Sequence, residues 1–241
     1  RPDRALLGPI LVVGGALVAM GLAYTLVRQR TLGQEVEQLH RQSQLHSQSL
    51  QQRVDRYRTL PQVLALDPEL LAAVSTVGAS SIDETNRRIR LNQRLEGANS
   101  VTRSSTLTLI DRHGVAIAAS NWRLPTSNVG GDYSFRPYFK EAVAEGRGRF
   151  YGIGLTTGAP GYFLSEAIRD ADGRVAGVIV IKIELEALEQ EWLETPDVVL
   201  VTDAQGVVFL SSRGEWRYRT LAPLDDDDRR EIAVTRQYPQ Q

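Results

Sequence analysis

Tyr133 and Arg136 have side chains that can bind an anion, and they lie three apart in the stretch 133–139 (YSFRPYF). An arginine guanidinium donates two parallel hydrogen bonds to a carboxylate, and a phenol adds a third donor. At this spacing, directly before a predicted helix, both groups are able to converge on one carboxylate. The pair is therefore a candidate binding site for an anionic small molecule.

Lys182 supplies a second cation in the strand-like run 178–183 (VIVIKI). Strand alternation places Lys182 on the same face as Val178 and Val180, among apolar neighbours. A buried ammonium needs an anionic partner or a route to water, because an unpaired buried charge is costly. That partner is either a ligand or a carboxylate of the chain itself, and the sequence leaves both open.

Between these two elements, the stretch 152–161 (GIGLTTGAPG) offers backbone amides and hydroxyl groups to an anion. We name Gly154, Thr156 and Thr157 as candidate ligand contacts. Tyr162 and Ser165, on the following predicted strand, are further candidates. Glycine-rich stretches also form ordinary turns, which is the alternative interpretation.

Catalysis receives little support from the sequence. It contains no nucleophile elbow, phosphate-binding P-loop or zinc-protease motif, and it has no cysteine for a disulfide, thiolate metal site or nucleophile. The formal net charge of −1 gives no basic domain for nucleic acid. We expect no catalytic residues, no metal, no cofactor on this chain and no nucleic-acid partner.

The element that comes first is an uncharged apolar run at 6–27, which follows a short flank at 1–5. Roughly 22 residues at 1.5 Å each span about 33 Å, close to the thickness of a bilayer core. We predict one transmembrane helix here. Arginines flank the run on both sides, so charge alone does not set its orientation. The chain starts with Arg rather than Met, and we expect the native protein to start earlier.

Residues 28–104 are predicted to form a long helix and a helical connection. Apolar residues such as Leu32, Val36 and Leu39 recur at alternating steps of four and three, which places one stripe along the helix. Polar residues interrupt the stripe farther along. Packing against the chain's own domain and pairing with a second copy in a homodimer are both open.

The rest of this region is predicted to break into shorter helices. Pro61 ends or kinks the long helix, and Pro68 begins a short one. The stretch 78–81 is predicted to be a loop. Asp83 is predicted to cap a second helix that extends to about Asn99.

From residue 105 the pattern changes to strands, and we assign 105–195 to one α+β module. The predicted hairpin is followed by a helix that Gly146 ends, by three strands, and by a helix that Pro196 ends. The predicted strands are 107–111, 115–120, 149–155, 162–169 and 175–184, and the predicted helices are 137–145 and 185–194.

A weak internal repeat indicates a second module. Asp111, Gly114 and Ser120 recur with the same spacing as Asp203, Gly206 and Ser212. The pattern suits a turn that needs an Asx hydrogen bond and a residue with positive φ, so an unrelated hairpin is the alternative. We assign 196–241 to a partial second module, in which the acidic run 225–228 begins a helix rather than holding calcium. Too few strands follow to close it, and we expect it to be truncated.

Five motifs together resemble the extracytoplasmic sensor region of C4-dicarboxylate sensor histidine kinases. The matching stretches are 120–122 (SNW), 133–139 (YSFRPYF), 151–157 (YGIGLTT), 160–165 (PGYFLS) and 177–182 (GVIVIK). The resemblance covers most of 6–241. It implies an α+β fold of two stacked PAS-like modules (dCache) on a long helix. It also implies exposure to the periplasm from a bacterial inner membrane.

The same resemblance implies the ligand and its contacts. Succinate, fumarate or malate is expected to bind in the membrane-distal module. Tyr133 and Arg136 are expected to hold one carboxylate, while Lys182 with Thr156 and Thr157 holds the other. Gly154, Tyr162 and Ser165 complete the expected site.

The resemblance also implies partners that lie outside this chain. No kinase or ATP-binding domain follows in the sequence, so ATP is expected only for a kinase domain elsewhere, which acts on a cytoplasmic response regulator. A homodimer through the long helix is expected. The alternatives are an input domain of a chemotaxis receptor or cyclase with another carboxylate or amino-acid ligand, a membrane-anchored assembly module, and an exported hydrolase. An amino acid requires an acidic partner for its ammonium, for which Asp132 is the nearest candidate.

Overall fold

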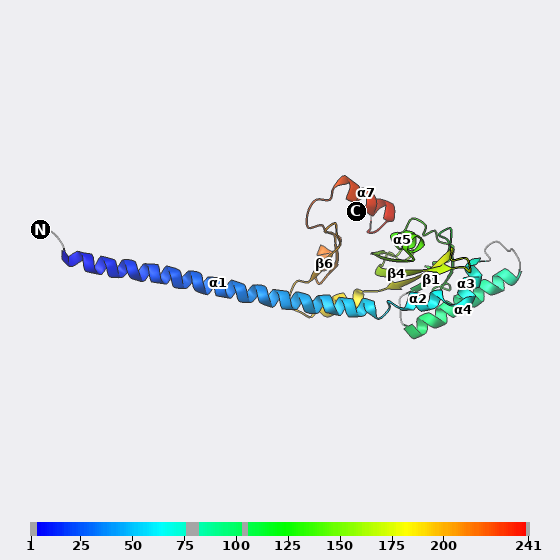
Figure 1. The fold of residues 1–241 in the computed structure, drawn as a ribbon, viewed down its shortest axis with the longest axis horizontal. Coiled ribbons are helices and arrows are strands. Elements are labelled where there is room, and N and C mark those ends of the chain that lie inside the picture. Colours follow the sequence, from blue (N-terminus) through cyan, green and yellow to red (C-terminus); the bar gives the residue numbers. More distant parts are fainter. Residues whose placement is uncertain (1–3, 76–81, 103–105, 240–241) are drawn as a thin grey trace. The chain divides into compact units, whose positions relative to one another are not determined.

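A computed structural model describes the backbone of residues 4–75, 82–102 and 106–239 (Figure 1). The chain divides into two compact units, residues 1–49 and residues 50–241. The first unit consists of most of helix α1 (Arg4–Asp55), and the second holds all the other helices and strands. The two units are described separately below.

Helix α1 contains the apolar run 6–27, but most side chains of that run lie outside the described part of the chain. Within the described part, no helix combines the length and the apolar character that a membrane crossing requires. The transmembrane segment therefore stays a prediction. Val36 and Leu39 of α1, which belong to the stripe predicted from the sequence, are exposed in this unit.

Three shorter helices follow at the start of the second unit. They are α2 (Leu60–Ala65), α3 (Pro68–Ser75) and α4 (Ile82–Thr102). Pro61 lies in the first turn of α2, where its missing N–H costs nothing, and Pro68 begins α3 as predicted. Helix α4 begins at Ile82, one residue earlier than the predicted cap, and so includes Asp83. The predicted loop 78–81 lies outside the described residues.

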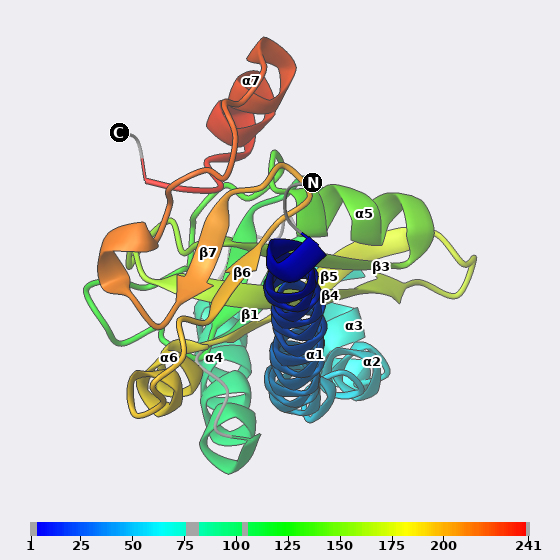
Figure 2. The ribbon, with the colours of Figure 1, turned by 90° about the vertical axis from the view of Figure 1, so that its left-hand side faces the viewer.

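The distal module, which corresponds to the predicted module at 105–195, is built on an antiparallel five-stranded sheet with strand order β2-β1-β5-β4-β3 (Figure 2). The strands are β1 (Thr106–Asp111), β2 (Ala116–Ala119), β3 (Arg147–Ile153), β4 (Pro160–Arg169) and β5 (Val175–Ile183). Helix α5 (Pro137–Glu145) covers one face, and α2, α3 and α4 cover the other. Gly146 ends α5 with a φ of 93°, as predicted.

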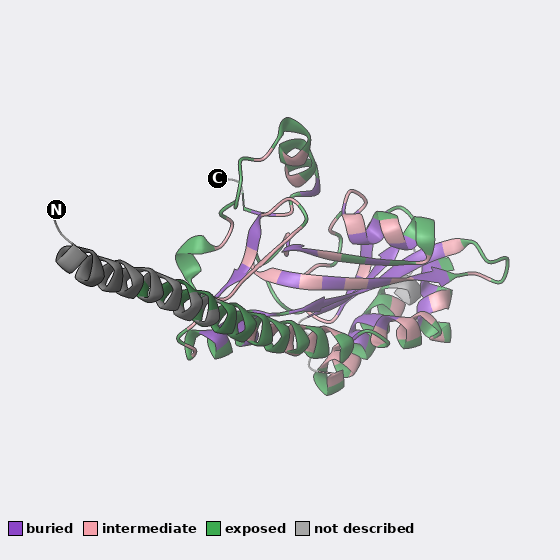
Figure 3. Cartoon of the chain, turned by 60° about the vertical axis from the view of Figure 1, so that its left-hand side comes forward, coloured by how far each residue is buried: buried purple, intermediate pink, exposed green. Residues whose placement is uncertain are grey.

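The central strand β5 is buried on both faces, which explains its unbroken apolar run. Ile179 and Ile181 belong to the larger core, which includes residues of α3 and α4, while Val178 and Val180 pack with Phe163 beneath α5. Figure 3 shows this burial along the strands and the exposure of the described part of α1. Lys182 continues the row of Val178 and Val180, so it too lies on the α5 side of the sheet.

The region predicted to be a second module follows helix α6 (Glu186–Leu193). Its described elements are β6 (Leu200–Thr202), β7 (Val208–Ser211), the short 3-10 helix η1 (Gly214–Trp216) and α7 (Asp226–Thr235). The acidic run does begin α7, since the Asp225 carboxylate accepts a hydrogen bond from the Asp228 amide at 2.8 Å. We call this part, residues 196–241, the proximal module.

The repeat holds at the level of single hydrogen bonds. The Asp111 carboxylate accepts from the His113 and Val115 amides, and the Asp203 carboxylate accepts from the Gln205 and Val207 amides. The hydroxyl oxygens of Ser120 and Ser212 each accept from a backbone amide thirteen residues earlier. The shared spacing therefore has a common structural cause in both hairpins.

A substitution at Gly114 tests how closely the β1–β2 hairpin packs against its surroundings. A Cβ atom at Gly114 would lie 2.4 Å from Ser134 Cβ, whereas one at Gly130 meets nothing within 4 Å, although both glycines have positive φ. We expect Gly114→Ala to destabilise the chain by about 1–3 kcal/mol more than Gly130→Ala, because only the first adds a clash to the backbone strain. Thermal unfolding of the two variants measures the difference, and equal melting temperatures would contradict the close approach.

Candidate functional site

A small cavity lies between α5, the loop 154–159 and the α5 side of the sheet. It encloses about 20 Å³, which is space for about one water molecule. Six of the predicted site residues line it together: Tyr133, Arg136, Gly154, Thr156, Thr157 and Lys182. The fold therefore brings together residues between Tyr133 and Lys182 that the strands β3 and β4 separate in the sequence.

Arg136 is fully buried at the N-terminus of α5. Its Nη1 atom donates to the backbone carbonyls of Thr235 and Arg236, at 2.7 and 2.9 Å, and its Nη2 atom donates to the Ile153 carbonyl. Its Nε atom has no hydrogen-bond partner among the described residues, and no described carboxylate forms an ion pair with it. Burial lowers the pKa of this guanidinium.

Aromatic rings surround the same guanidinium. Its Cζ atom lies 5.1 Å from the ring centroid of Phe150, 5.7 Å from that of Phe163 and 5.8 Å from that of Tyr138. Aromatic faces attract a cation without neutralising it, so the positive charge stays available to an anion. Arg136 is consequently held in place by carbonyls and aromatic rings but not neutralised by a described carboxylate.

Tyr133 is positioned by the turn that leads into α5. The Tyr133 amide donates to the Gly114 carbonyl at 2.7 Å, and the Arg136 amide donates to the Tyr133 carbonyl at 3.0 Å. Burial raises the pKa of the Tyr133 phenol to about 12. The phenol therefore keeps its proton at neutral pH and can donate a hydrogen bond into the cavity.

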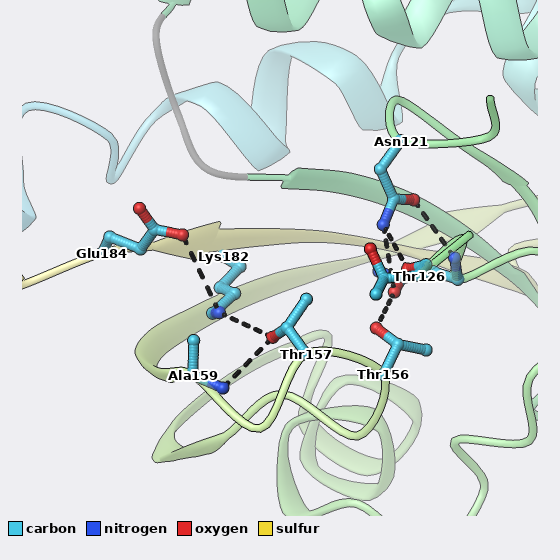
Figure 4. Close-up of polar contacts among 8 residues, drawn as sticks. Asn121, Thr126, Thr156, Thr157, Ala159, Lys182 and Glu184 are labelled. Atoms are coloured by element: carbon cyan, nitrogen blue, oxygen red, sulfur yellow. Dashed lines mark hydrogen bonds and ion pairs between the residues drawn. The ribbon is translucent and has the colours of Figure 1, made fainter. Parts of the chain in front are cut away.

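Lys182 approaches the cavity from β5 (Figure 4). Its Nζ atom lies 3.4 Å from the Thr157 hydroxyl oxygen and 4.0 Å from a Glu184 carboxylate oxygen. The Lys182 side chain is only 7% exposed, whereas that of Glu184 is 52% exposed, so this ion pair is long and open to solvent on one side. Burial lowers the pKa of the Lys182 ammonium. The internal salt bridge that the sequence left open is therefore a weak one.

Glycines make room for this lysine. A Cβ atom at Gly161 would lie 2.5 Å from Lys182 Cε, and one at Gly154 would lie 2.7 Å from the Thr157 hydroxyl oxygen and 3.4 Å from Lys182 Nζ. Any side chain at either position would push into the lysine or its hydroxyl partner. Gly154 thus shapes the site, although the sequence suggested it mainly as a source of backbone amide.

Asn128 is a cavity residue that sequence reasoning missed. Its side-chain amide donates to the Thr108 hydroxyl at 2.8 Å, and its side-chain oxygen accepts from the Thr156 hydroxyl at 2.8 Å. Asn121 supports this arrangement, because its side-chain oxygen accepts a hydrogen bond from the Asn128 backbone amide at 3.1 Å. Asn128 therefore ties the loop 154–159 to β1. Thr106 and Thr108 also line the cavity, and strand alternation in β1 was the signal that could have found them.

Tyr162 and Ser165 do not line this cavity. The β4–β5 register pairs Phe163 with Lys182, so Tyr162 lies on the opposite face of the sheet, where it packs against the larger core. Ser165 faces α5, but its hydroxyl donates to the Tyr138 carbonyl at 2.7 Å and is buried there. Ser165 thus supports α5 rather than facing the cavity.

The cavity offers hydrogen-bond donors to anions at two places, next to Arg136 and next to Lys182. Its two cations come from separate elements, α5 and β5, and hydroxyl and phenol donors accompany each of them. In the part of the chain that the structure describes, no group of three or more acidic, histidine or cysteine side chains could hold a metal ion. None of the described residues that line the cavity carries a carboxylate, which an ammonium group would need as a partner.

Comparison with protein families matches residues 25–238 to the Cache domain family dCache_1. Two curated relatives are both C4-dicarboxylate transport sensor proteins named DctB. The protein of Rhizobium meliloti (strain 1021) is 36% identical over 216 residues, which are 88% of this chain and 34% of the relative. The protein of Pseudomonas aeruginosa PAO1 is 34% identical over 214 residues, with the same coverage. The chain therefore spans about a third of the length of these relatives.

Solved structures agree with this comparison. The sensor domain of the V. cholerae histidine kinase DctB has a TM-score of 0.74 and 32% identity, over 83% of this chain and 76% of that one. The ligand-binding domain of the P. aeruginosa amino acid chemoreceptor PctC has a TM-score of 0.51 and 20% identity, over 76% of this chain and 80% of that one. The second likeness shows a shared fold alone.

Proposed function

Because the chain belongs to the Cache domain family, we propose that its second unit is the periplasmic ligand-binding region of a C4-dicarboxylate sensor histidine kinase. The proposed ligand is a four-carbon diacid such as succinate, fumarate or malate. The observation that carries the proposal is that two buried cations, Arg136 and Lys182, line one cavity and that, among the described residues, neither has a carboxylate partner closer than 4.0 Å. A diacid supplies one carboxylate to each of them.

The energies are compatible with this ligand. A four-carbon diacid has about eight heavy atoms, and the best small ligands reach about 1.5 kcal/mol per atom, which allows up to about 12 kcal/mol. Micromolar affinity needs about 8 kcal/mol. Hydrogen bonds to charged groups contribute roughly 1.5 to 3 kcal/mol each, so contacts at two cations are sufficient.

The cavity has to widen to admit this ligand. Its volume of about 20 Å³ matches one water molecule rather than a diacid. The sheet and α5 are tied together by packed aromatic rings and by the bond between Ser165 and Tyr138. The loop 154–159 is attached mainly by side-chain hydrogen bonds from Thr156 and Thr157, so we expect this loop to move outward.

The remaining parts of the proposal rest on the sequence and on the names of the relatives. The run 6–27 anchors the chain in the bacterial inner membrane, and α1 pairs with a second copy to form a homodimer. The kinase domain, which binds ATP and acts on a separate cytoplasmic response regulator, belongs to the remainder of a longer protein. The region described here binds the ligand and passes on its occupancy.

The competing functions fit the cavity less well. An amino-acid ligand requires a carboxylate for its ammonium, but the Asp132 carboxylate accepts from the Ser134 amide at 2.9 Å and does not line the cavity. An assembly module has no need of two converging buried cations. A hydrolase requires a nucleophile and a base in contact, and the described lining residues include no histidine or carboxylate that could act as that base.

A ligand panel tests the proposal. Titration calorimetry of the full chain in detergent should detect binding of succinate, fumarate and malate. Butyrate, which has one carboxylate on the same chain length, should bind at least about a hundredfold more weakly because it leaves one cation without its hydrogen bonds. Alanine should not bind, since the cavity offers no acidic partner. Binding of alanine in preference to all diacids would reject the proposed ligand class.

The depressed pKa of Lys182 predicts a pH dependence for binding. A diacid needs the ammonium charged, and a bound carboxylate raises the pKa of that ammonium. We therefore expect succinate affinity to fall as the pH rises through the Lys182 pKa, which burial places below the usual lysine value of about 10.4. The Tyr133 phenol, with its pKa raised to about 12, titrates later. Calorimetry across alkaline pH should show this fall in the wild type. An unchanged fall in Lys182→Met would assign it to another group.

A further inference from the structure

We propose that Arg136 also couples ligand binding in the cavity to the proximal module. We call Arg136 and the three backbone carbonyls that it contacts, those of Ile153, Thr235 and Arg236, the joint. This inference rests on the proposed function, because it gives a second task to the residue that anchors one carboxylate. Arg136 lies in the distal module, but both of its Nη1 hydrogen bonds go to carbonyls about 100 residues later in the chain, at Thr235 and Arg236. These carbonyls stand at the C-terminal end of α7.

The end of a helix is a suitable place to hold a cation. The last carbonyls of α7 lack partners within the helix and carry the negative end of its dipole. Arg136 satisfies two of them, while they compensate part of its buried charge. Breaking this contact would therefore leave unpaired polar groups on both sides, which makes it a strong link between the modules.

Ile153 ties the cavity loop to the same joint. It ends β3 directly before the loop 154–159, its carbonyl accepts a bond from Arg136 Nη2, and its amide donates to the Gln237 carbonyl at 2.9 Å. The segment 235–238, which we call the α7 end segment, is thus bonded both to Arg136 and to the root of the loop that has to move. Opening the cavity disturbs both attachments at once.

A ligand carboxylate competes for the same guanidinium. Of the five N–H groups of Arg136, three have carbonyl acceptors, and Nε is without a partner in the described residues. A carboxylate is a stronger acceptor than a neutral carbonyl. Its arrival at Nε and Nη2 changes the bonds that Arg136 makes to Ile153 and to the α7 end segment. The coupling is reciprocal, so the state of that segment must also change ligand affinity.

Hydrogen–deuterium exchange on the full chain tests the joint directly. Without any ligand, Arg136→Lys should speed exchange in peptides covering 232–238, because a lysine ammonium lacks the planar fork that reaches the three carbonyls. Arg149→Lys, an exposed arginine on β3, is the matched control and should leave those peptides unchanged. Adding succinate to the wild type should change exchange in the same peptides. Wild-type exchange that succinate leaves unchanged while it binds would overturn the coupling.

A pair of variants at Gln237 tests the reverse direction. Gln237→Pro removes the amide that donates to the Ile232 carbonyl and disfavours the left-handed conformation of Arg236, which has a φ of 49°. Gln237→Ala keeps the backbone and serves as the control. Neither Arg236 nor Gln237 lines the cavity. We expect Gln237→Pro to change the succinate dissociation constant by roughly fivefold or more, the lower end of typical allosteric couplings, and Gln237→Ala to leave it unchanged.

The outcomes separate this inference from the proposed function. If the wild type binds no diacid, both the proposed function and the coupling are wrong. Faster exchange in Arg136→Lys would then show only that Arg136 stabilises the α7 end segment. If the wild type binds succinate but either the exchange at 232–238 or the affinity of a folded Gln237→Pro is unchanged, the proposed function stands and the coupling alone is wrong. If Gln237→Pro does not fold, the succinate effect on wild-type exchange decides.

Discussion

Succinate binding to Arg136→Ala should be lost, with the dissociation constant raised by about a hundredfold to ten-thousandfold. The variant removes two charge-assisted hydrogen bonds, each worth roughly 1.5 to 3 kcal/mol, and about 1.4 kcal/mol corresponds to a tenfold change in affinity. Calorimetry measures the change. Tyr133→Phe should have a smaller effect of about tenfold, because it removes one neutral donor and keeps the ring.

Arg136→Ala also has a structural cost that needs a control. Three backbone carbonyls lose their donor, so the melting temperature should fall, and titration has to be carried out well below it. Arg149→Ala, which removes an exposed arginine of β3, should change neither property. A folded Arg136→Ala that binds succinate as tightly as the wild type would show that the arginine serves only the contact between modules.

The second large effect is expected for Lys182→Met, which should weaken binding and strengthen the fold. Methionine keeps an unbranched apolar stem against Gly161 but removes the ammonium. Succinate affinity should drop by about tenfold to a hundredfold, in line with the loss of a bond of roughly 1.5 to 3 kcal/mol. Butyrate affinity should stay the same, because its single carboxylate uses Arg136.

Stability should change in the opposite direction. The unfolded chain binds the Lys182 proton more tightly than the folded chain, because burial lowers the folded pKa. The buried ammonium therefore costs stability at neutral pH, and the cost fades only as the pH rises above the folded pKa. Thermal unfolding should show a higher melting temperature for Lys182→Met, whereas Lys140→Met on the exposed side of α5 should show no change. A lower melting temperature for Lys182→Met would instead mean that the long pair with Glu184 stabilises the fold.

Much of the fold could be predicted because local rules agree with the tertiary structure. Proline and glycine set both ends of α5, and the apolar run of β5 indicated a strand buried on both faces. The repeat of Asp, Gly and Ser was detectable because each residue makes a short-range hydrogen bond or turn that needs its residue type. The turn and cap features depend on residues that are close in the sequence.

The features that the sequence did not predict depend on strand register and on contacts between residues far apart in the sequence. Alternation within β4 separates Tyr162 from Phe163, but only the pairing with β5 shows which of them faces Lys182. Asn128 sits in an irregular loop, where no periodicity assigns a face. The bonds from Arg136 to Thr235 and Arg236 join two modules, and no local pattern predicts such a contact. The sequence thus indicated both cations but not what already holds one of them.

A crystal structure of the chain with succinate tests the central claim most directly. The account predicts one succinate carboxylate within hydrogen-bond distance of Arg136 and Tyr133, and the other within reach of Lys182 and Thr157, in a cavity widened by movement of the loop 154–159. A succinate bound elsewhere, or one that touches only one of the two cations while the other keeps its present partners, would contradict it.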